Sequence, residues 1–315
     1  MPAFLDRAAV DRALPYAALI GALRETFAEG LEAPVRHHHE IPRAGKDPAT
    51  LLLMPAWRPD REIGVKLLTI FPGNEAATGL PSVQAVYLLF DGASGAPRAL
   101  LDGTALTLRR TAAASALATD FLAREDSSRL LMIGAGALAP HLVRAHAVVR
   151  PIRQVMVWNR TPERARRLAG ELAREGFEAR AVTDRIAALQ EADIVSCATM
   201  STTPLVPGDR VRPGTHVDLV GAFRPDMRES DDALMRRAEV YVDTTTGALA
   251  EAGDIIQALR SGALSREAIR GDLYALCRGR CAGRREPAAI TVFKSVGSAV
   301  EDLAAAALVA ASVPG

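Results

Sequence analysis

The chain has 315 residues, of which 49% are apolar and 4% aromatic, and its 38 lysines and arginines balance 37 aspartates and glutamates. That length allows one large domain or two of ordinary size. The balanced charge argues against a nucleic-acid partner and against an acidic solvating tail, and the apolar runs break well before the roughly 18 residues of a membrane span.

The three cysteines, Cys197, Cys277 and Cys281, are too few and odd in number for a disulfide framework. Cys277 and Cys281 would share a helix face, but no second ligand cluster accompanies them, so ordinary reduced thiols are favoured over a zinc site. The first residues include acids and contain no signal-peptide core. We therefore expect a cytoplasmic protein without a membrane partner.

The first third of the chain is predicted to be an antiparallel sheet with a helix. Residues 9–30 repeat Ala, Leu and Ile on a helical period. Short apolar runs separated by turn residues follow at 50–54, 63–71 and 83–90. The last run continues through DGASGAP into RALLDG, as a hairpin does. An Ala-rich segment at 107–122 then favours a long helix.

From Arg129 onward the pattern changes to strand, glycine turn, helix and strand. Two segments have this pattern: RLLMIGAGALAPHLVRAHAVV and QVMVWNRTPERARRLAGELAREG. In the second, Thr161 is expected to cap the helix and Pro162 to occupy its first position. Further strands are expected in ADIVSCAT, HVDLVGA and EVYVDTT. This alternation predicts an α/β fold, with a Rossmann-type doubly wound parallel sheet beside a smaller α+β domain.

The last segment, ITVFKSVGSAVEDLAAAALVAAS, is predicted to form a short strand, a glycine turn and a C-terminal helix. We expect that helix to return to the first domain. The predicted division is therefore a discontinuous first domain, 1–111 with 291–315, and a dinucleotide-binding domain at 112–290.

A glycine motif marks the dinucleotide site. Gly134-Ala135-Gly136-Ala137-Leu138-Ala139 fits G-x-G-x-x-G/A, follows a strand directly and opens a helix. Gly134 would permit the tight turn, Gly136 would let the backbone reach a pyrophosphate, and the helix N-terminus around Ala137 and Leu138 would supply N–H donors. The alternative is that these glycines merely turn a strand into a helix.

The end of the second strand indicates which nucleotide binds. NAD-binding units place an acid about 20 residues past the glycines, but here the strand ends in Asn159, Arg160 and Thr161, with Arg164 one turn into the helix. A 2′-phosphate would meet no repulsion, and Arg160 could pair with it. We predict NADP(H), with NAD(H) possible; the alternative is that both arginines only solvate a helix start.

Three cationic positions precede the nucleotide unit: Arg36, Lys66 and Arg110. Lys66 interrupts an apolar strand, where a buried lysine is costly unless it is paired or functional. For each position, an ordinary surface charge is the alternative.

Several segments resemble the ornithine cyclodeaminase/mu-crystallin family: GVKLLTIFPGN, GLPSVQAVYLLFDGASGAPRALLDGTALTLRRTAAASALA, GAGALA, VWNRTPERA, ADIVSCAT and VGAFRPDMRESD. The resemblance covers nearly the whole chain. It implies a homodimer whose first domain forms the subunit contact and the substrate site. Members include ornithine cyclodeaminases, alanine dehydrogenases, cyclic ketimine reductases and mu-crystallins.

The resemblance also implies roles for single residues. Arg36, Lys66 and Arg110 would bind the substrate carboxylate. Residues near the nicotinamide or the phosphates would be Ser82, Thr111, Thr199, Val220 and Ser295. Arginine grips a carboxylate bidentately, and a lysine with a pKa lowered by neighbouring charges could pass a proton to an imine nitrogen. For this reason Lys66 and Arg110 are the predicted catalytic residues.

The sequence HHH at 37–39 invites a metal interpretation. Consecutive residues on a strand point to opposite faces, and no acid or histidine recurs at ligand spacing. We therefore predict no metal site there.

Phe223 separates the possible reactions. In ornithine cyclodeaminases an aspartate follows the strand that here ends in Val220, and Phe223 occupies its position, with Asp226 three residues later. A phenyl ring cannot accept a proton or hold a δ-ammonium, but it can pack against an apolar ring.

The leading expectation is therefore NADPH-dependent reduction of a cyclic imino acid, Δ1-pyrroline-2-carboxylate or Δ1-piperideine-2-carboxylate, to proline or pipecolate. Ornithine cyclodeaminase is the first alternative. Amino-acid dehydrogenase or N-methylating imine reductase activity is another, and a non-catalytic, crystallin-like role in binding NADPH is an alternative of a different class.

Overall fold

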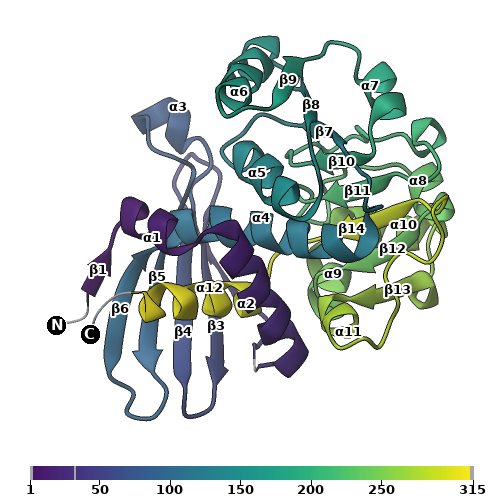
Figure 1. The fold of residues 1–315 in the computed structure, drawn as a ribbon. Coiled ribbons are helices and arrows are strands. Elements are labelled where there is room, and N and C mark those ends of the chain that lie inside the picture. Colours follow the sequence, from purple (N-terminus) through teal and green to yellow (C-terminus); the bar gives the residue numbers. More distant parts are fainter. Residues whose placement is uncertain (1–2, 32, 313–315) are drawn as a thin grey trace. The chain divides into compact units, whose positions relative to one another are not determined.

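The computed structural model describes residues 3–31 and 33–312 of the chain. The chain forms two compact units (Figure 1). Unit 1 runs up to Thr111 and resumes at Ser298, and unit 2 comprises Ala112–Gly297. Among the described residues, no helix is both long and apolar enough to span a bilayer.

Within the described residues, unit 1 contains one sheet of order β1-β6-β5-β4-β3-β2. Neighbouring strands are antiparallel, except that β1 pairs parallel to β6. The strands are β1 (Ala3–Leu5), β2 (His37–Ile41), β3 (Ala49–Arg58), β4 (Glu62–Ile70), β5 (Val83–Asp91) and β6 (Pro97–Asp102). The helices are α1 (Arg7–Ala13), α2 (Tyr16–Glu29), α3 (Asn74–Thr78), α12 (Ala299–Ala311) and the first half of α4 (Gly103–Leu122).

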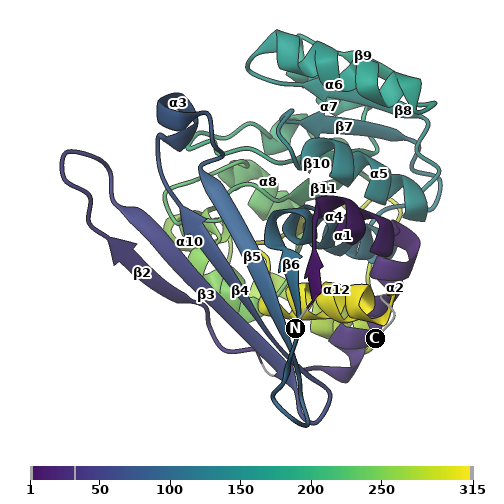
Figure 2. The same ribbon diagram turned by 90° about the vertical axis from the view of Figure 1, so that its left-hand side faces the viewer.

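Helix α12 crosses one face of this sheet and contacts β3, β4, β5, β6 and α2 (Figure 1). Side chains alternate along a strand, and on β4 the positions at Gly64, Lys66 and Leu68 are buried under this helix layer. Figure 2 shows β2 at the outer edge, next to β3. All five side chains of β2, including those of the HHH segment, are exposed.

Two helix predictions in unit 1 need correction. The helix expected at 9–30 is broken, because Pro15 is extended at ψ 137° and separates α1 from α2. The helix expected from Thr107 begins at Gly103. Asp102 explains the earlier start, since its carboxylate accepts hydrogen bonds from the backbone N–H groups of Thr104 and Ala105, both at 2.9 Å.

Unit 2, all of whose residues are described, is a doubly wound sheet of eight parallel strands in the order β13-β12-β14-β11-β10-β7-β8-β9. The strands are β7 (Arg129–Ile133), β8 (Gln154–Trp158), β9 (Glu178–Ala181), β10 (Ile194–Cys197), β11 (His216–Leu219), β12 (Glu239–Val242), β13 (Ile269–Asp272) and β14 (Thr291–Lys294). Helices lie on both sides of the sheet (Figure 1): α5 (Ala139–Val149), α6 (Pro162–Arg174), α7 (Arg185–Glu191), α8 (Asp232–Arg237), α9 (Thr245–Glu251), α10 (Gly253–Ser261), α11 (Leu273–Cys277) and the second half of α4. The predicted fold class is confirmed.

The division of the chain differs from the expected one at its second boundary. The sequence placed residues 291–315 in the first domain, but β14 pairs with β11 and β12 inside the parallel sheet. Residues up to Gly297 therefore belong to unit 2, and only the helix after them returns to unit 1.

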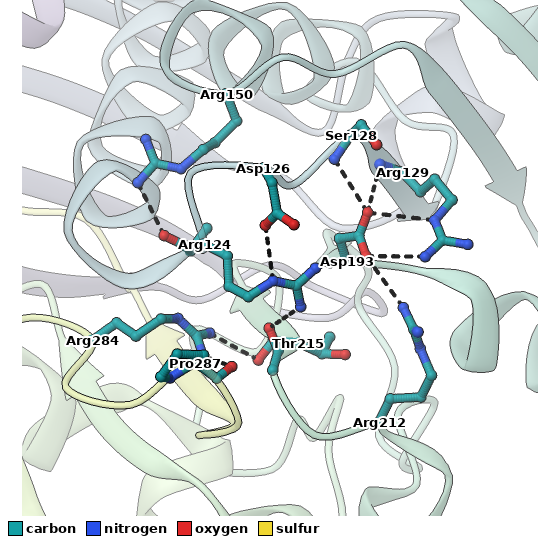
Figure 3. Close-up of polar contacts among 12 residues, drawn as sticks. Arg124, Asp126, Ser128, Arg129, Arg150, Asp193, Arg212, Thr215, Arg284 and Pro287 are labelled. Carbon is teal, nitrogen blue, oxygen red and sulfur yellow. Dashed lines mark hydrogen bonds and ion pairs between the residues drawn. The ribbon is translucent and has the colours of Figure 1, made fainter.

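A buried carboxylate organises the amino-terminal edge of the parallel sheet (Figure 3). Asp193, which is 3% exposed, accepts hydrogen bonds from Nη2 of Arg124, Arg129 and Arg212, each at 3.2 Å. It also accepts from the backbone N–H groups of Ser128 and Arg129 at 3.2 and 3.1 Å. Burial would raise the pKa of Asp193, but Arg129 and these N–H groups outweigh it and lower that pKa. Asp193 is thus an anionic anchor for this edge.

Candidate functional site

Four charged side chains of unit 1 form a buried ion cluster: Lys66, Arg110, Glu301 and Asp302. None is more than 5% exposed. Lys66 Nζ lies 2.9 Å from Asp302 Oδ1 and 2.7 Å from Asp302 Oδ2. Arg110 donates from Nε to Asp302 Oδ1 at 2.9 Å and from Nη1 to Glu301 Oε2 at 2.6 Å. Two cations therefore face two anions away from solvent.

Three elements bring these side chains together. Lys66 lies on the inner face of β4, and Arg110 lies on α4 in a segment rich in alanine. Glu301 and Asp302 occupy the first turn of α12. Anionic side chains are favoured there, because the helix dipole places partial positive charge at its N-terminus.

Burial and charge adjust the proton affinities in this cluster. Burial lowers the pKa of Lys66 to about 8, and the positive charge of Arg110 acts in the same direction, while Asp302 opposes both. Burial would raise the pKa of Asp302, but Arg110 and Lys66 outweigh it, so that pKa is lowered. Near neutral pH the cluster therefore holds an ionised carboxylate beside an ammonium that can release its proton.

Arg36 belongs to the same neighbourhood. It precedes β2, and its positive charge lowers the pKa values of both Lys66 and Asp302. The structure thus brings together the three cationic positions selected from the sequence. Ser82 and Thr111, expected near the cofactor, also belong to unit 1: Ser82 precedes β5, and Thr111 directly follows Arg110.

Sequence reasoning missed Glu301 and Asp302. A signal was present, because these two adjacent carboxylates interrupt the otherwise apolar helix AVEDLAAAALVAA. Acids are almost never fully buried unless they are paired, so a pair inside such a helix calls for cationic partners. Lys66 and Arg110 are those partners.

In unit 2 the predicted glycine turn has the shape that a phosphate needs. Gly134 has φ +107°, and a Cβ there would lie 2.6 Å from the carbonyl oxygen of Ala198. A Cβ on Gly136 would meet no atom within 4 Å, so the backbone is open on that side. Helix α5 starts at Ala139, and its N-cap residue Leu138 offers no side-chain cap. Such a turn and helix N-terminus fit a dinucleotide pyrophosphate.

Asn159 supports this turn from the second strand. Its Oδ1 accepts the backbone N–H of Ala135 at 3.1 Å, and its Nδ2 donates to the carbonyl of Thr161 at 3.0 Å. Thr161 occupies the N-cap position of α6 but forms no side-chain cap bond, contrary to expectation. Arg160 and Arg164 are exposed beside it.

An open pocket of about 460 Å³ adjoins the end of the second strand. Its lining residues are Trp158, Thr183, Asp184, Arg185 and Ile186. The guanidinium of Arg185 stacks on the Trp158 ring, with its carbon 4.7 Å from the ring centroid. Sequence reasoning did not select these residues; the pocket has planar groups against which a base could stack.

Three further predicted residues lie at the carboxyl-terminal edge of the same sheet. Thr199, Val220 and Ser295 come just after β10, β11 and β14. The strands are in register there, since Val220 N donates to Cys197 O at 2.9 Å and Ser295 N donates to Leu219 O at 3.1 Å. In doubly wound sheets this edge is where ligands bind.

Phe223 follows the same edge. It is half-buried, and its N–H donates to the carbonyl of Gly221 at 2.9 Å in a tight turn. Asp226 is exposed and is held by Arg224, whose Nε donates to Asp226 Oδ1 at 2.9 Å. The nearest acid downstream of Phe223 is therefore engaged by an arginine of its own loop.

Comparisons with known proteins find relatives over nearly the whole chain. A model of the ornithine cyclodeaminase/mu-crystallin family matches residues 1–314. A Δ1-pyrroline-2-carboxylate reductase of Paracoccus denitrificans is 43% identical over 302 residues, covering 93% of this chain and 94% of the relative. The ketimine reductase mu-crystallin of Mus musculus is 37% identical over 317 residues, covering 98% and 96%.

A solved structure is similar over the same length. The Thermococcus litoralis Δ1-pyrroline-2-carboxylate reductase, in complex with NADH and L-proline, has a TM-score of 0.92 and 34% identity. The match covers 98% of this chain and 96% of that chain.

Proposed function

Because the chain belongs to the ornithine cyclodeaminase/mu-crystallin family, we propose that it is a nicotinamide-dependent oxidoreductase that reduces a cyclic imino acid. The substrate class is Δ1-pyrroline-2-carboxylate or Δ1-piperideine-2-carboxylate, and the product is proline or pipecolate. One observation carries the proposal: the buried cluster of Lys66, Arg110, Glu301 and Asp302, which combines carboxylate-binding cations with a lysine of lowered pKa.

Arg36 and Arg110 are proposed to bind the substrate carboxylate. An arginine has five N–H donors in a fixed fork, enough to hold two acids and a substrate carboxylate together. The contacts of Arg110 with Glu301 and Asp302 fix the plane of its guanidinium. A carboxylate bound to a fixed plane holds the adjacent ring carbon in one orientation. When the second reactant is also held, such orientation lowers the activation free energy of the reaction substantially.

Lys66 is proposed to supply the proton of the reaction. A bound reduced nicotinamide supplies the hydride to the ring carbon that carries the carboxylate. The C=N double bond becomes a single bond, and the ring nitrogen takes a proton from the Lys66 ammonium, which becomes a neutral amine. Asp302 holds the ammonium through a hydrogen bond to Oδ1 and an ion-pair contact to Oδ2, and thereby restricts the directions of the other N–H donors of Lys66.

The rate of imino acid reduction and the rate of the reverse oxidation are expected to depend on pH in opposite senses. Lys66 is protonated below its pKa of about 8. Reduction needs that proton, so kcat/KM for the imino acid should fall by about tenfold per pH unit above this value. Oxidation of proline or pipecolate needs the free amine and should rise through the same pH. Initial rates in both directions from pH 6 to 10 check this, and parallel profiles in the two directions would contradict it.

The cofactor is proposed to be NADP(H), with NAD(H) as the alternative. Asn159 stands at the second strand end, where an acid would repel a 2′-phosphate, and Arg160 and Arg164 are exposed beside it. The stacked pair of Trp158 and Arg185 is proposed to receive the adenine. Paired titrations with NADPH and NADH decide between the two, and clearly tighter NADH binding would reverse the preference.

Phe223 supports reduction over ornithine deamination. A phenyl ring cannot hold the δ-ammonium of ornithine, and Asp226 is already paired with Arg224. The proposed role of Phe223 is to pack against the apolar part of the substrate ring. Incubation of the protein with ornithine and NAD+ should release no ammonia and form no proline; rapid ammonia release would favour a cyclodeaminase instead.

The protein is also proposed to be a homodimer through the second face of the unit 1 sheet. Opposite the face that α12 covers, β3, β4 and β5 present apolar side chains in register, including Trp57, Ile63, Leu67, Val86 and Leu88. Ile63 and Val86 are each 39% exposed, and contiguous apolar surface of this kind marks interaction sites. Sedimentation velocity should show a dimer that Val86→Glu converts to a monomer; an unaltered dimer in that variant would place the contact elsewhere.

A further inference from the structure

A second buried carboxylate lies at the carboxyl-terminal edge of the unit 2 sheet. Glu229 has no exposed surface. Its Oε1 accepts from the backbone N–H of Thr199 at 2.6 Å and from the Thr199 hydroxyl at 2.8 Å. Its Oε2 accepts from the backbone N–H of Gly221 at 2.7 Å. One carboxylate therefore joins the loop after β10 to the loop after β11.

A second layer of buried groups holds Glu229 in place. Asp254 Oδ1 accepts from the backbone N–H groups of Glu229 and Ser230 at 2.9 and 2.8 Å, and from the Ser230 hydroxyl at 2.8 Å. Lys294 Nζ lies 3.7 Å from Asp254 Oδ2 and donates to the carbonyl of Leu219 at 3.2 Å. Asp254 and Lys294 are also fully buried, so the position of Glu229 is determined by packed, hydrogen-bonded neighbours.

The two loops are in close contact at the point where Glu229 joins them. A Cβ on Gly221 would lie 1.9 Å from the carbonyl oxygen and 2.4 Å from the nitrogen of Thr199. Only glycine allows this approach. The backbone of Gly221 is therefore packed directly against the backbone of Thr199, and Glu229 accepts a hydrogen bond from the N–H group of each residue.

The chemistry of the contacts requires two acceptor oxygens. Each oxygen of Glu229 faces a backbone N–H, and an amide side chain would place an NH₂ group against one of them. Burial raises the pKa of Glu229 to about 7, with Lys294 acting in the opposite sense. Burial makes this carboxylate costly to ionise, yet it accepts three hydrogen bonds, which indicates that it serves to hold the two loops together.

We propose that Glu229 is a positioning residue for the nicotinamide half of the dinucleotide, because it fixes the backbone at Thr199 and Gly221. This inference rests on the proposed function, since it assumes that a dinucleotide binds at this edge. The glycine turn at Gly134 would hold the pyrophosphate with its own backbone, whereas the backbone N–H groups that Glu229 binds are those of Thr199 and Gly221. Loss of the carboxylate should therefore weaken recognition of the nicotinamide riboside and leave recognition of the adenosine diphosphate part intact.

The test compares Glu229→Gln with Asp193→Asn, a matched control that alters a buried, amide-binding carboxylate at the opposite edge of the same sheet. Calorimetry measures Kd for NADPH and NADH, and for 2′-phospho-ADP and ADP, which lack the nicotinamide riboside. Glu229→Gln should weaken both dinucleotides by at least about tenfold and change the fragments less than twofold. Asp193→Asn should lower Tm and leave all four Kd values unchanged.

Hydrogen exchange gives a readout that does not depend on nucleotide. The amides of Thr199 and Gly221 should exchange faster in Glu229→Gln than in the wild type, and should be unchanged in Asp193→Asn. If Glu229→Gln does not fold, Glu229→Asp replaces it, because the shorter side chain keeps the charge but withdraws the carboxylate from the N–H groups of Thr199 and Gly221. The same pattern of Kd values is expected from it.

Two results would overturn the inference. One is an equal loss of affinity for dinucleotides and fragments, which would make Glu229 a general stabilising residue. The other is unchanged dinucleotide affinity in a folded variant. If the wild type binds none of the four nucleotides, the proposed function itself is wrong and the inference falls with it, so the wild-type titration separates the two failures.

Discussion

Replacement of Lys66 by alanine is expected to lower kcat/KM for a cyclic imino acid by at least ~100-fold. The side chain is proposed to carry the proton that the ring nitrogen receives, and it is 1% exposed, so bulk water is a poor substitute. The loss should appear in kcat more than in KM, because the carboxylate would still meet Arg36 and Arg110. Steady-state rates with saturating NADPH measure both constants.

Two further variants separate proton transfer from charge. Lys66→Arg keeps a positive charge that does not dissociate in the working pH range, and it should remain as inactive as Lys66→Ala. Lys46→Ala removes an exposed lysine of the same unit and should match the wild type. If Lys66→Ala retains activity within threefold of the wild type, Lys66 is not the proton donor.

Substitution of Asp302 by asparagine is expected to produce the largest loss of stability. It leaves Lys66 and Arg110 buried with only Glu301 to balance them, and breaking a buried ion cluster in this way costs about 3–5 kcal/mol. Asp302 also raises the pKa of Lys66, so the alkaline limit of the reduction rate should move below pH 8. Urea unfolding and the pH profile of kcat/KM measure the two effects.

The effect of pH on stability has a definite sign. The pKa of Asp302 is lowered in the folded chain, so its contribution is present above its unfolded pKa of about 3.9 and is lost as the pH falls through the folded value. Asp302→Asn should therefore lose less stability on acidification than the wild type.

A double variant separates the contribution of the buried ion pair to stability from the contribution of Lys66 to catalysis. Lys66→Met with Asp302→Asn removes one charge of each sign, and it should recover most of the stability lost in Asp302→Asn alone. Activity should not return, because the proton donor is absent. A stable double variant with wild-type activity would exclude both proposed roles.

The fold was predictable because its signals are local. The alternation of apolar strands, glycine turns and helices from Arg129 onward predicted the parallel sheet, and the structure confirms that fold class. The errors also have local causes. Pro15 separates two helices, although the repeat of Ala, Leu and Ile on both sides of it predicted one continuous helix. The strand β14 has only four residues, so its sequence did not indicate that it belongs to the parallel sheet.

The candidate site was only partly predictable. Lys66 was noticeable because one charge interrupts an apolar strand, but its partner Asp302 lies 236 positions later along the chain. Glu301, the partner of Arg110, lies 191 positions after that arginine. Glu229 was equally difficult to predict, because its carboxylate oxygens bind the backbone N–H groups of Thr199 and Gly221, which no sequence motif marks. Pairings of this kind depend on the tertiary fold.

The central claim is that this chain reduces a ring that already contains its C=N bond. Purified protein should be mixed with Δ1-pyrroline-2-carboxylate, Δ1-piperideine-2-carboxylate and open-chain imines, with NADPH and NADH in parallel, and nicotinamide absorbance should be followed. We expect rapid oxidation of NADPH with at least one cyclic substrate, slower oxidation of NADH, and formation of proline or pipecolate. Binding of NADPH without its oxidation by any cyclic imino acid would contradict the account.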